Sequence, residues 1–200
     1  MSIYANGQVS VTLKGLTATN LVRNGNFANG TANWNKNNSN LSVINNTLLV
    51  TADGTSKIPR AYCYFTNIGI GAKKLYRRLR VRVTNADCTQ ISVYYSGAIN
   101  PIIKNINTPV QNQWYYISET TTGDFTKVSP QIYIRHSYAD ATIANGKVME
   151  VQEVFAIDMT AGGLENLTAD QMNAKFPHYF DGTKSTISFS RFLRTVSFQD

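Results

Sequence analysis

The sequence has few cysteines and histidines, and this scarcity limits the chemistry it can carry. Only two of each occur in 200 residues. Cys63 and Cys88 are isolated, and in a chain without a secretion signal we expect both to stay reduced and to pack as small apolar groups. No Cys-x-x-Cys or His-x-x-x-His spacing is present, which argues against a zinc site.

Long apolar runs are missing as well. A membrane-spanning helix needs about 20 consecutive apolar residues, and the apolar runs here are far shorter. The segment from Met1 to Tyr4 lacks a basic stretch followed by an apolar one, so we expect no signal peptide and no membrane partner. A chain of this length is expected to form one domain, and burying ~70% of its unfolded surface gives it enough core to fold without disulfides.

The common catalytic motifs are absent too. There is no Gly-x-Ser-x-Gly, and the glycines of Ile68 to Lys74 fit neither a dinucleotide-binding nor a Walker pattern. His136 and His178 stand in unrelated contexts. A glycosidase needs two carboxylates that flank the bond to be cut; Asp124 with Asp140 would be one such pair, but nothing in the sequence marks it. We therefore predict that the chain is not an enzyme.

Acidic residues are scarce in one part of the chain. Residues 1–118 contain twelve Lys or Arg against two acids, Asp53 and Asp87, which gives a charge of about +10. The remaining residues hold seven Lys or Arg and ten acids, a charge of −3, and the whole chain carries +7. This asymmetry predicts an acidic partner for one face of the molecule. Candidates are a polyanionic cell-wall polymer, nucleic acid or a negatively charged neighbour in an assembly.

The sequence is rich in short segments that alternate between apolar and polar residues. From Leu75 to Val83, leucine and valine alternate with arginine, as in a half-buried strand. Leu41 to Thr51 predicts a hairpin that turns at Asn45-Asn46, because asparagine tolerates the left-handed backbone of a tight hairpin. Further strands are expected at 20–27, 61–65, 91–95, 114–118, 131–135 and 148–158. Nine or ten strands with a single helix predict an all-β sandwich.

That helix lies between residues 148 and 182. Thr168 fits a helix N-cap, and Gln171 three residues later completes a capping box. We therefore expect a helix from about Ala169 to Lys175. It is followed by a proline and then by Tyr-Phe-Asp-Gly, an aromatic segment closed by a turn.

Motifs at both ends of the chain resemble a known family. The strand, short helix and Pro-His-Tyr-Phe-Asp-Gly closure of residues 148–182 resemble the end of a module common in minor structural proteins of phage tails and baseplates. The segment TATNLVRNGNF from Thr17 to Phe27, followed by Gly30 and Trp34, resembles the first strand of jelly-roll carbohydrate-binding modules in those tail proteins. The resemblance covers residues 8–184, and its middle part agrees only in pattern.

The resemblance implies a fold and a division of the chain. It predicts an all-β jelly-roll β-sandwich with one short C-terminal helix and terminal strand extensions. The expected parts are an N-terminal lead-in strand or arm at 1–18, a carbohydrate-binding-like jelly roll at 19–182 and a C-terminal strand extension at 183–200. The last part, from Ser185 to Phe198, alternates as a strand and is a candidate for pairing with another chain or with its own sheet.

The same resemblance bears on calcium. Jelly-roll sugar-binding modules often hold a structural Ca²⁺ with an acid just after the first strand's Asn-Gly-x-Phe and another acid in the last strand. Ala28 stands at the first of these places, so one hard oxygen ligand is missing. Glu153 or Asp158 would supply the second acid, but such a site is short of negative charge. We expect no cofactor, with these two acids as the candidates should calcium bind.

Exposed aromatic rings are the features that would bind a glycan, because sugars stack on them. Alternation places Tyr94 outside when its neighbours Val93 and Tyr95 face inwards, and Tyr133 follows the same rule. Size favours Trp114 and Tyr116 as core residues, which leaves Tyr115 outside. The candidate glycan-binding residues are Tyr94, Tyr115, Tyr133, Arg135 and Tyr138, beside the basic row Arg78, Arg80 and Arg82. Each tyrosine would equally suit an ordinary half-buried strand face.

These observations predict a non-catalytic accessory module of a phage tail or baseplate that binds a host cell-surface glycan for adsorption. The glycan class rests on the resemblance, and the basic region points to an anionic wall polymer such as teichoic acid. The alternatives are a structural virion protein that contacts other tail proteins without binding sugar, and a lectin-like domain of a prophage. No helix-turn-helix, RNP-like or zinc motif supports nucleic-acid binding. By analogy we expect a trimer, assembled in the host cytoplasm and located in the virion.

Overall fold

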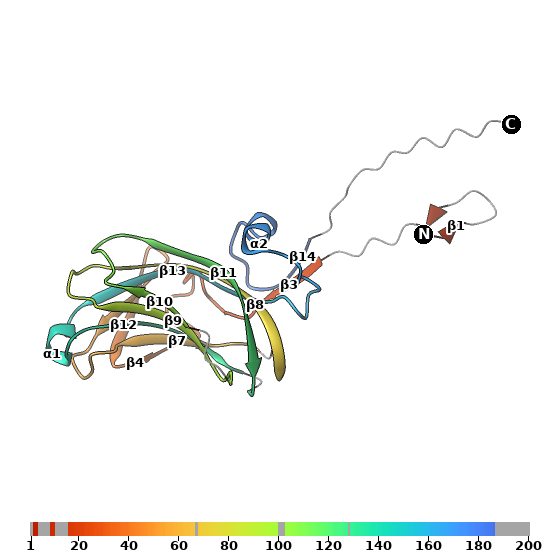
Figure 1. Ribbon diagram of the computed structural model, residues 1–200. Helices are drawn as coiled ribbons and strands as arrows, with labels where there is room; N and C mark the ends of the chain where they lie inside the picture. The colour runs from red at the N-terminus through yellow and green to blue at the C-terminus, as the bar shows by residue number, and fades with distance from the viewer. Residues whose placement is uncertain are drawn as a thin grey trace.

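Two antiparallel sheets face each other across one hydrophobic core (Figure 1). The computed structural model describes residues 2–3, 9–10, 16–66, 68–99, 103–127 and 129–186. One sheet has the order β10-β9-β12-β7-β4, whose strands are Ile103–Asn107, Gln90–Ser96, Gln131–Ser137, Arg60–Tyr64 and Trp34–Asn37. This is the all-β jelly-roll sandwich that the sequence predicts.

The second sheet has seven strands. Its main path is β11-β8-β13-β3-β14, while β6 also pairs with β13 and β5 pairs with β6. These strands are Tyr115–Phe125, Gly71–Val83, Val148–Asp158, Leu16–Asn20, Gly182–Thr186, Thr47–Ala52 and Ser39–Ile44. The short strands β1 (Ser2–Ile3) and β2 (Val9–Ser10) pair with each other, and the helices are α1 (Ala141–Ala144) and α2 (Ala169–Lys175). The single turn α1 has no counterpart in the sequence prediction.

The β5–β6 hairpin and helix α2 form where the sequence predicts them. The hairpin of β5 and β6 turns at Asn45 and Asn46, whose φ angles of 48° and 58° are the left-handed values that a two-residue turn requires. Helix α2 begins at its predicted residue, and its capping box is complete because the Thr168 side chain accepts from the Gln171 backbone and the Gln171 side chain accepts from the Thr168 backbone.

The sandwich core is built from alternate residues of both sheets. On the five-stranded sheet, Val93, Tyr95, Ile132 and Ile134 face inwards and are fully buried, as the alternation predicts. Cys63 and Cys88 are both buried in this core, which confirms the prediction that they pack as small apolar groups. Burial raises the pKa of the Cys63 thiol to about 11, so this thiol is held in its unreactive protonated form.

His136 is also a core residue, and its burial makes stability depend on pH. Its side chain has no exposed surface, and its Nδ1 lies 2.8 Å from the Tyr138 hydroxyl. Desolvation lowers the pKa of His136 to about 3, whereas an unfolded histidine titrates near 6.5. Between these two pH values the unfolded chain binds one more proton than the folded chain, so the free energy of unfolding falls as the pH falls.

We therefore expect His136 to reduce the free energy of unfolding by up to about 1.4 kcal/mol per pH unit below pH 6. Urea unfolding of the protein and of His136→Gln between pH 4 and pH 7 measures this effect. The variant should show a flatter pH dependence. Equal slopes for both proteins would contradict this assignment, since the same carboxylates titrate in each.

The two motifs behind the family resemblance meet in space. The Gly25 carbonyl accepts from the Val154 backbone at 2.9 Å, and the Ala156 carbonyl accepts from Leu21 at 2.7 Å. From the closing aromatic segment, the Tyr179 hydroxyl accepts from the Gly25 backbone at 2.7 Å. The start of the jelly roll, its last long strand and the Tyr-Phe-Asp-Gly segment therefore form one connected structure.

The predicted strand at 20–27 is wrong. The strand there is β3, Leu16–Asn20, and the chain from residue 21 to 33 runs in turns. Asn24 and Phe27 have φ angles of 51° and 58°, which regular strand backbone does not adopt. The Asn24 side chain instead organises the turns by donating to the carbonyls of Gly30 and Ala32 at 2.9 Å each.

A bulge in β13 creates a second, smaller core. Register with β8 shifts between Gln152 and Phe155, and Glu153 adopts a φ of 52°. Side chains beyond the bulge change face, so Phe155 and Ile157 point to the outside of the seven-stranded sheet. There they pack beneath α2 and the aromatic segment, together with Ala18, Tyr76, Met159, Leu164, Met172 and Phe176. Figure 1 shows α2 beside the end of the sandwich formed by β3 and β14.

The expected borders of the jelly roll fall inside strands. Strand β3 includes residue 18, and β14 includes residue 183; the two strands pair from Leu16 opposite Thr186 to Asn20 opposite Gly182. Most of the predicted lead-in arm and the C-terminal extension beyond Thr186 lie outside the described residues. Among the helices that the structure describes, none is long and apolar enough to cross a membrane.

Candidate functional site

Three tyrosines form a row across the outer face of the five-stranded sheet. Tyr133 on β12 is the register partner of both Tyr94 on β9 and Tyr62 on β7. The rings of Tyr94 and Tyr133 are parallel within 5°, with centroids 4.9 Å apart, and those of Tyr62 and Tyr133 are 5.0 Å apart at 26°. This ladder covers both ring faces of Tyr133, and the Tyr133 hydroxyl donates to Gln131 Oε1.

Two arginines stand in the next row of the same face. Arg60 on β7 and Arg135 on β12 are direct cross-strand partners, and each lies diagonally over a ring of the neighbouring strand. The Arg60 guanidinium carbon is 5.5 Å from the Tyr133 ring centroid, and that of Arg135 is 5.1 Å from the Tyr94 centroid. Cations over aromatic faces at these distances are attracted by the ring quadrupole.

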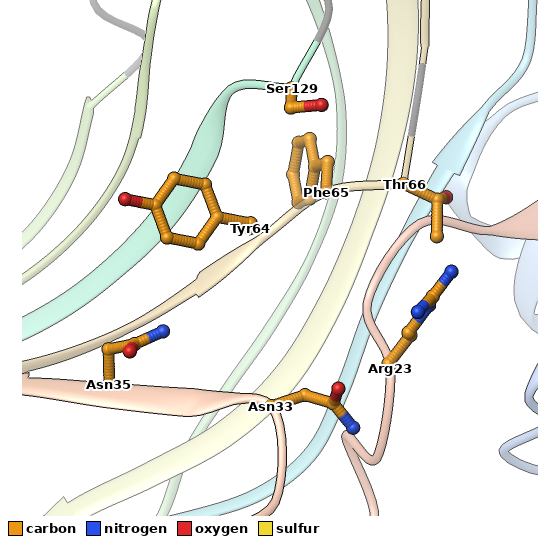
Figure 2. Close-up of a pocket in the computed structure, with 7 residues that line it drawn as sticks. All are labelled: Arg23, Asn33, Asn35, Tyr64, Phe65, Thr66 and Ser129. Atoms are coloured by element: carbon orange, nitrogen blue, oxygen red, sulfur yellow. The ribbon is translucent and has the colours of Figure 1, made fainter.

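The ladder ends at a hollow beside β7 and β4. Tyr64, two residues after Tyr62, is 51% exposed, and its ring lies edge-on to Tyr62 with centroids 5.9 Å apart. The hollow has a volume of about 490 Å³, and its lining residues are Arg23, Asn33, Asn35, Tyr64, Phe65, Thr66 and Ser129 (Figure 2). Figure 2 shows the Tyr64 ring on one side of this space and Arg23 and Asn33 on the other.

A second hollow adjoins the first along β4. Its volume is about 400 Å³, and its lining residues are Thr31, Trp34, Asn35, Lys36, Asn40, Leu41 and Tyr62. Asn35 lines both hollows, because it stands on β4 opposite Tyr62. Each hollow thus combines a tyrosine with asparagine amides and a cationic side chain. Apolar rings with a few converging polar groups are typical of small-ligand and sugar sites.

Side chains in the first hollow are available to a ligand. Those of Arg23, Asn33 and Asn35 make no hydrogen bond or ion pair to another residue in the part of the chain that the structure describes. An asparagine amide offers both donors and an acceptor, which matches the mixed character of neighbouring sugar hydroxyls. Asn33 holds a φ of 68°, so the turn before β4 directs this side chain by an uncommon backbone conformation.

The predicted site residues divide between the two sheets. Tyr94, Tyr133 and Arg135 come together on the outer face of the five-stranded sheet, half-buried as the alternation predicts. Burial raises the pKa of Tyr133, with its tyrosine neighbours adding to the shift. Arg80 and Arg82 lie on the outer face of the other sheet, where both guanidinium groups contact the Trp114 ring at 5.1 and 4.7 Å. Arg82 also forms an ion pair at 2.7 Å with Glu150 on the neighbouring strand β13.

Three predicted site residues do not lie open on an outer sheet face: Tyr138 and Arg78 are buried, and Tyr115 turns toward the core. Tyr138 is 3% exposed and bonds to His136, so it belongs to the core. Arg78 is also 3% exposed, because α2 covers it; its guanidinium donates to the Phe176 carbonyl at 2.8 Å and lies 4.4 Å from the Phe155 centroid. These two placements are corrections of the prediction.

The third correction concerns β11. Tyr115 packs against the sandwich core, whereas Tyr116 is 55% exposed and Trp114 is half-buried. The alternation with buried Ile117 explains this, since residues 115 and 117 share a face. Ring size is therefore the wrong criterion here, and the alternation rule alone predicts the observed order.

The two candidate calcium ligands lie in different surroundings. Glu153 is exposed at the β13 bulge, and Asp158 is buried, where its Oδ1 accepts from Thr160 and Ala161 at 2.9 and 3.2 Å. No group of three or more Asp, Glu, His or Cys side chains able to hold a metal occurs among the described residues. Asp140, one of the two acids considered for catalysis, caps α1 by accepting from Ile143 at 2.8 Å.

Arg60, Tyr62 and Tyr64 escaped the sequence prediction. The sequence signal was present, because these residues alternate with Ala61, Cys63 and Phe65 on a predicted strand. Both faces carry an aromatic residue, so composition alone does not tell which face is outside. The buried alanine and cysteine resolve this, since small residues pack against the opposite sheet in the core.

Comparison with known proteins finds similarity at the level of the fold. No protein-family model matches the chain, and no curated protein sequence matches it. Among solved structures, the arabinose-bound α-L-arabinofuranosidase MgGH51 superposes with a TM-score of 0.52 at 14% identity over 69% of this chain and 26% of that chain. The enzymatically active domain of tailspike protein 4 from bacteriophage CBA120 superposes with a TM-score of 0.50 at 13% identity, over 68% and 21%.

A third solved structure is similar over nearly the whole of its own chain. TmCBM61, solved with β-1,4-galactotriose, has a TM-score of 0.49 at 9% identity over 70% of this chain and 98% of that chain. The matched part of this chain corresponds to about a quarter of the arabinofuranosidase and a fifth of the tailspike domain. At these identities, the likeness to those two proteins shows a common sandwich fold and no more.

Proposed function

We propose that this chain is a non-catalytic glycan-binding module and that it binds sugar in the two hollows along β4. The observation that carries this proposal is the pairing of Tyr64 and Tyr62 with free asparagine amides at one margin of the five-stranded sheet. A sugar ring would stack on Tyr64, and Asn33 and Asn35 would bond its hydroxyls. The stacked ladder behind them holds Tyr62 in place.

The biological setting of the proposal is a phage tail or baseplate accessory protein that attaches to a host cell-surface glycan. The motifs at 17–27 and 148–182 support it, because they resemble those of tail proteins and meet in one structure. Of the two proteins that share the fold, one is a phage tailspike by name and the other is an arabinose-bound arabinofuranosidase, and both names are compatible with this setting. Contacts with other virion proteins, a trimeric state and location in the virion remain part of this proposal.

Tyr64→Ala is expected to weaken retention on purified host cell wall by about tenfold, since it removes the ring on which the sugar would stack. The melting temperature should stay nearly unchanged, because Tyr64 is 51% exposed. Tyr116→Ala is the matched control, as Tyr116 is 55% exposed on the other sheet. Cosedimentation with wall fragments measures the retention of both variants, and thermal unfolding measures their melting temperatures. Equal retention of the two variants would contradict the site, and no retention of the unaltered protein would favour the structural-protein alternative.

A further inference from the structure

The strands of the five-stranded sheet contain no acidic residue. Their sequences are IKNIN, QISVYYS, QIYIRHS, RAYCY and WNKN, which hold Lys36, Arg60, Lys104 and Arg135 but neither Asp nor Glu. In the seven-stranded sheet, Arg77 forms an ion pair with Glu119 and Arg82 with Glu150, while Arg78 and Arg80 form none with the described residues. On the five-stranded sheet, Lys104 reaches Glu119 of β11 at 3.6 Å, whereas Arg60 and Arg135 have no acidic partner among the described residues.

Arg60 and Arg135 are the centre of this uncompensated charge. They are direct register partners on neighbouring strands, an arrangement in which like charges repel. Neither forms an ion pair with a residue that the structure describes, and the Nε of each is buried with no hydrogen-bond partner there. A buried donor on a charged group without an acceptor destabilises the fold. The described part of the chain therefore places two guanidinium groups on neighbouring strands and supplies no acceptor for their Nε–H donors.

We infer that Arg60 and Arg135 form a seat for one anionic group of the bound glycan, a carboxylate or a phosphodiester. This inference rests on the proposed function and adds the charge of the ligand to it. Planar guanidinium groups bind both kinds of anion through paired hydrogen bonds. The Tyr133 and Tyr94 rings beneath the two arginines hold the guanidinium groups in place before the ligand binds.

The seat is aligned with the hollows. Arg60, Tyr62 and Tyr64 alternate along β7 on one face, so successive members are about 6.6 Å apart. Tyr62 and Tyr64 each line a hollow, and Arg60 continues the row toward Arg135. An extended polymer lying along β7 would therefore place neutral sugar rings over the tyrosines and an acidic group over the arginines.

The tyrosine ladder favours a glycan over single-stranded nucleic acid. Successive bases need free ring faces on which to stack. Both faces of Tyr133 are covered by Tyr62 and Tyr94, and one face of Tyr94 is taken by Tyr133. The space with an open aromatic face lies at the β4 margin, where asparagines surround it.

A titration with small anions tests the seat directly. The probes are glucuronate, inorganic phosphate and neutral glucose, and the readout is the NMR resonance of each arginine Nε–H group. We expect saturable shifts at Arg60 and Arg135 with glucuronate and phosphate but not with glucose. Arg82 is the internal control, because Glu150 already occupies its Nε at 2.7 Å. Absence of saturable shifts at Arg60 and Arg135 would overturn the inference and leave the tyrosine site intact.

Arginine variants extend the test to polymers. Arg60→Gln and Arg135→Gln should each weaken binding of a hexuronate oligosaccharide or a poly(glycerol phosphate) teichoic acid by about tenfold. Binding of the fully methyl-esterified, neutral oligosaccharide should not change. The melting temperature should be unchanged or slightly higher, since each variant relieves repulsion between like charges.

The pattern of failures separates the two proposals. Equal binding of acidic and neutral oligosaccharides by all variants would refute the anion seat while keeping the sugar site. Loss of every glycan in Tyr64→Ala, with the arginine variants unaffected, would do the same. Tighter binding of a single-stranded oligonucleotide than of either polymer, abolished by the arginine variants, would replace the glycan by nucleic acid and refute both.

Discussion

Glu119→Ala is expected to lower the free energy of unfolding by about 3 kcal/mol, because it removes the carboxylate that faces the buried Arg77 guanidinium. The Arg77 side chain is only 1% exposed and that of Glu119 is 25% exposed. Arg77 Nε donates to Glu119 at 2.7 Å, and its Nη2 donates to the same oxygen. A further donor, Nη1, reaches the Val93 carbonyl of the other sheet at 3.2 Å. The pair thus joins the two sheets through their shared interior.

Two further variants distinguish charge from packing at this place. Glu119→Gln keeps one acceptor and should cost less than Glu119→Ala. Arg77→Met combined with Glu119→Leu removes both charges and should recover much of the loss, because a buried ion pair can often be replaced by apolar side chains of similar volume. Urea denaturation measures all three. A loss below about 1 kcal/mol for Glu119→Ala would contradict the view that Arg77 depends on this carboxylate.

Gly25→Ala should destabilise the protein strongly, although it adds only one methyl group. A Cβ at this position would lie 2.1 Å from the Val154 carbonyl oxygen and 2.9 Å from a ring carbon of Tyr179. The Val154 carbonyl is a backbone group and cannot rotate away. The same residue is also held close to Gly25, because the Val154 backbone N–H donates to the Gly25 carbonyl at 2.9 Å. The two segments would have to separate, and we expect a loss of about 3 kcal/mol or more.

The neighbouring Asn26→Ala provides the control for Gly25→Ala. Asn26 is partly exposed, and its side chain accepts only a long 3.4 Å bond from Ala28. Its replacement should change the melting temperature little, whereas Gly25→Ala should lower it strongly or prevent folding. Similar melting temperatures for both variants would mean that the Asn-Gly-Asn-Phe turn does not pack against β13.

Elements with strong local signals could be predicted from the sequence, and those that depend on tertiary contacts could not. The Asn45-Asn46 turn and the Thr168 cap act through their own backbone, so neighbouring residues suffice to specify them. The bulge at Glu153 has no comparable signal. The bulge reverses which side chains of β13 face inwards. The second core under α2 and the burial of Arg78 therefore cannot be predicted from alternation along the strand.

The candidate site was predictable only in part. Alternation correctly places Tyr94, Tyr133 and Arg135 outside, since their strands have clear inward partners. It says nothing of which strands are neighbours, so the ladder with Tyr62 and the facing pair of Arg60 and Arg135 depend on strand order. The +10 region also misleads on its own, because Arg77 and Arg82 meet their acids from the distant residues 119 and 150.

The most direct measurement of the central claim is an NMR footprint of an oligosaccharide released from the wall of a host that retains the protein. Backbone amides of β4 and β7 should shift most, with Asn33, Asn35 and Tyr64 among them, and amides on the outer face of β8 should not move. Shifts concentrated at Arg80, Arg82 and Trp114 would assign sugar binding to the other sheet and contradict the proposed site.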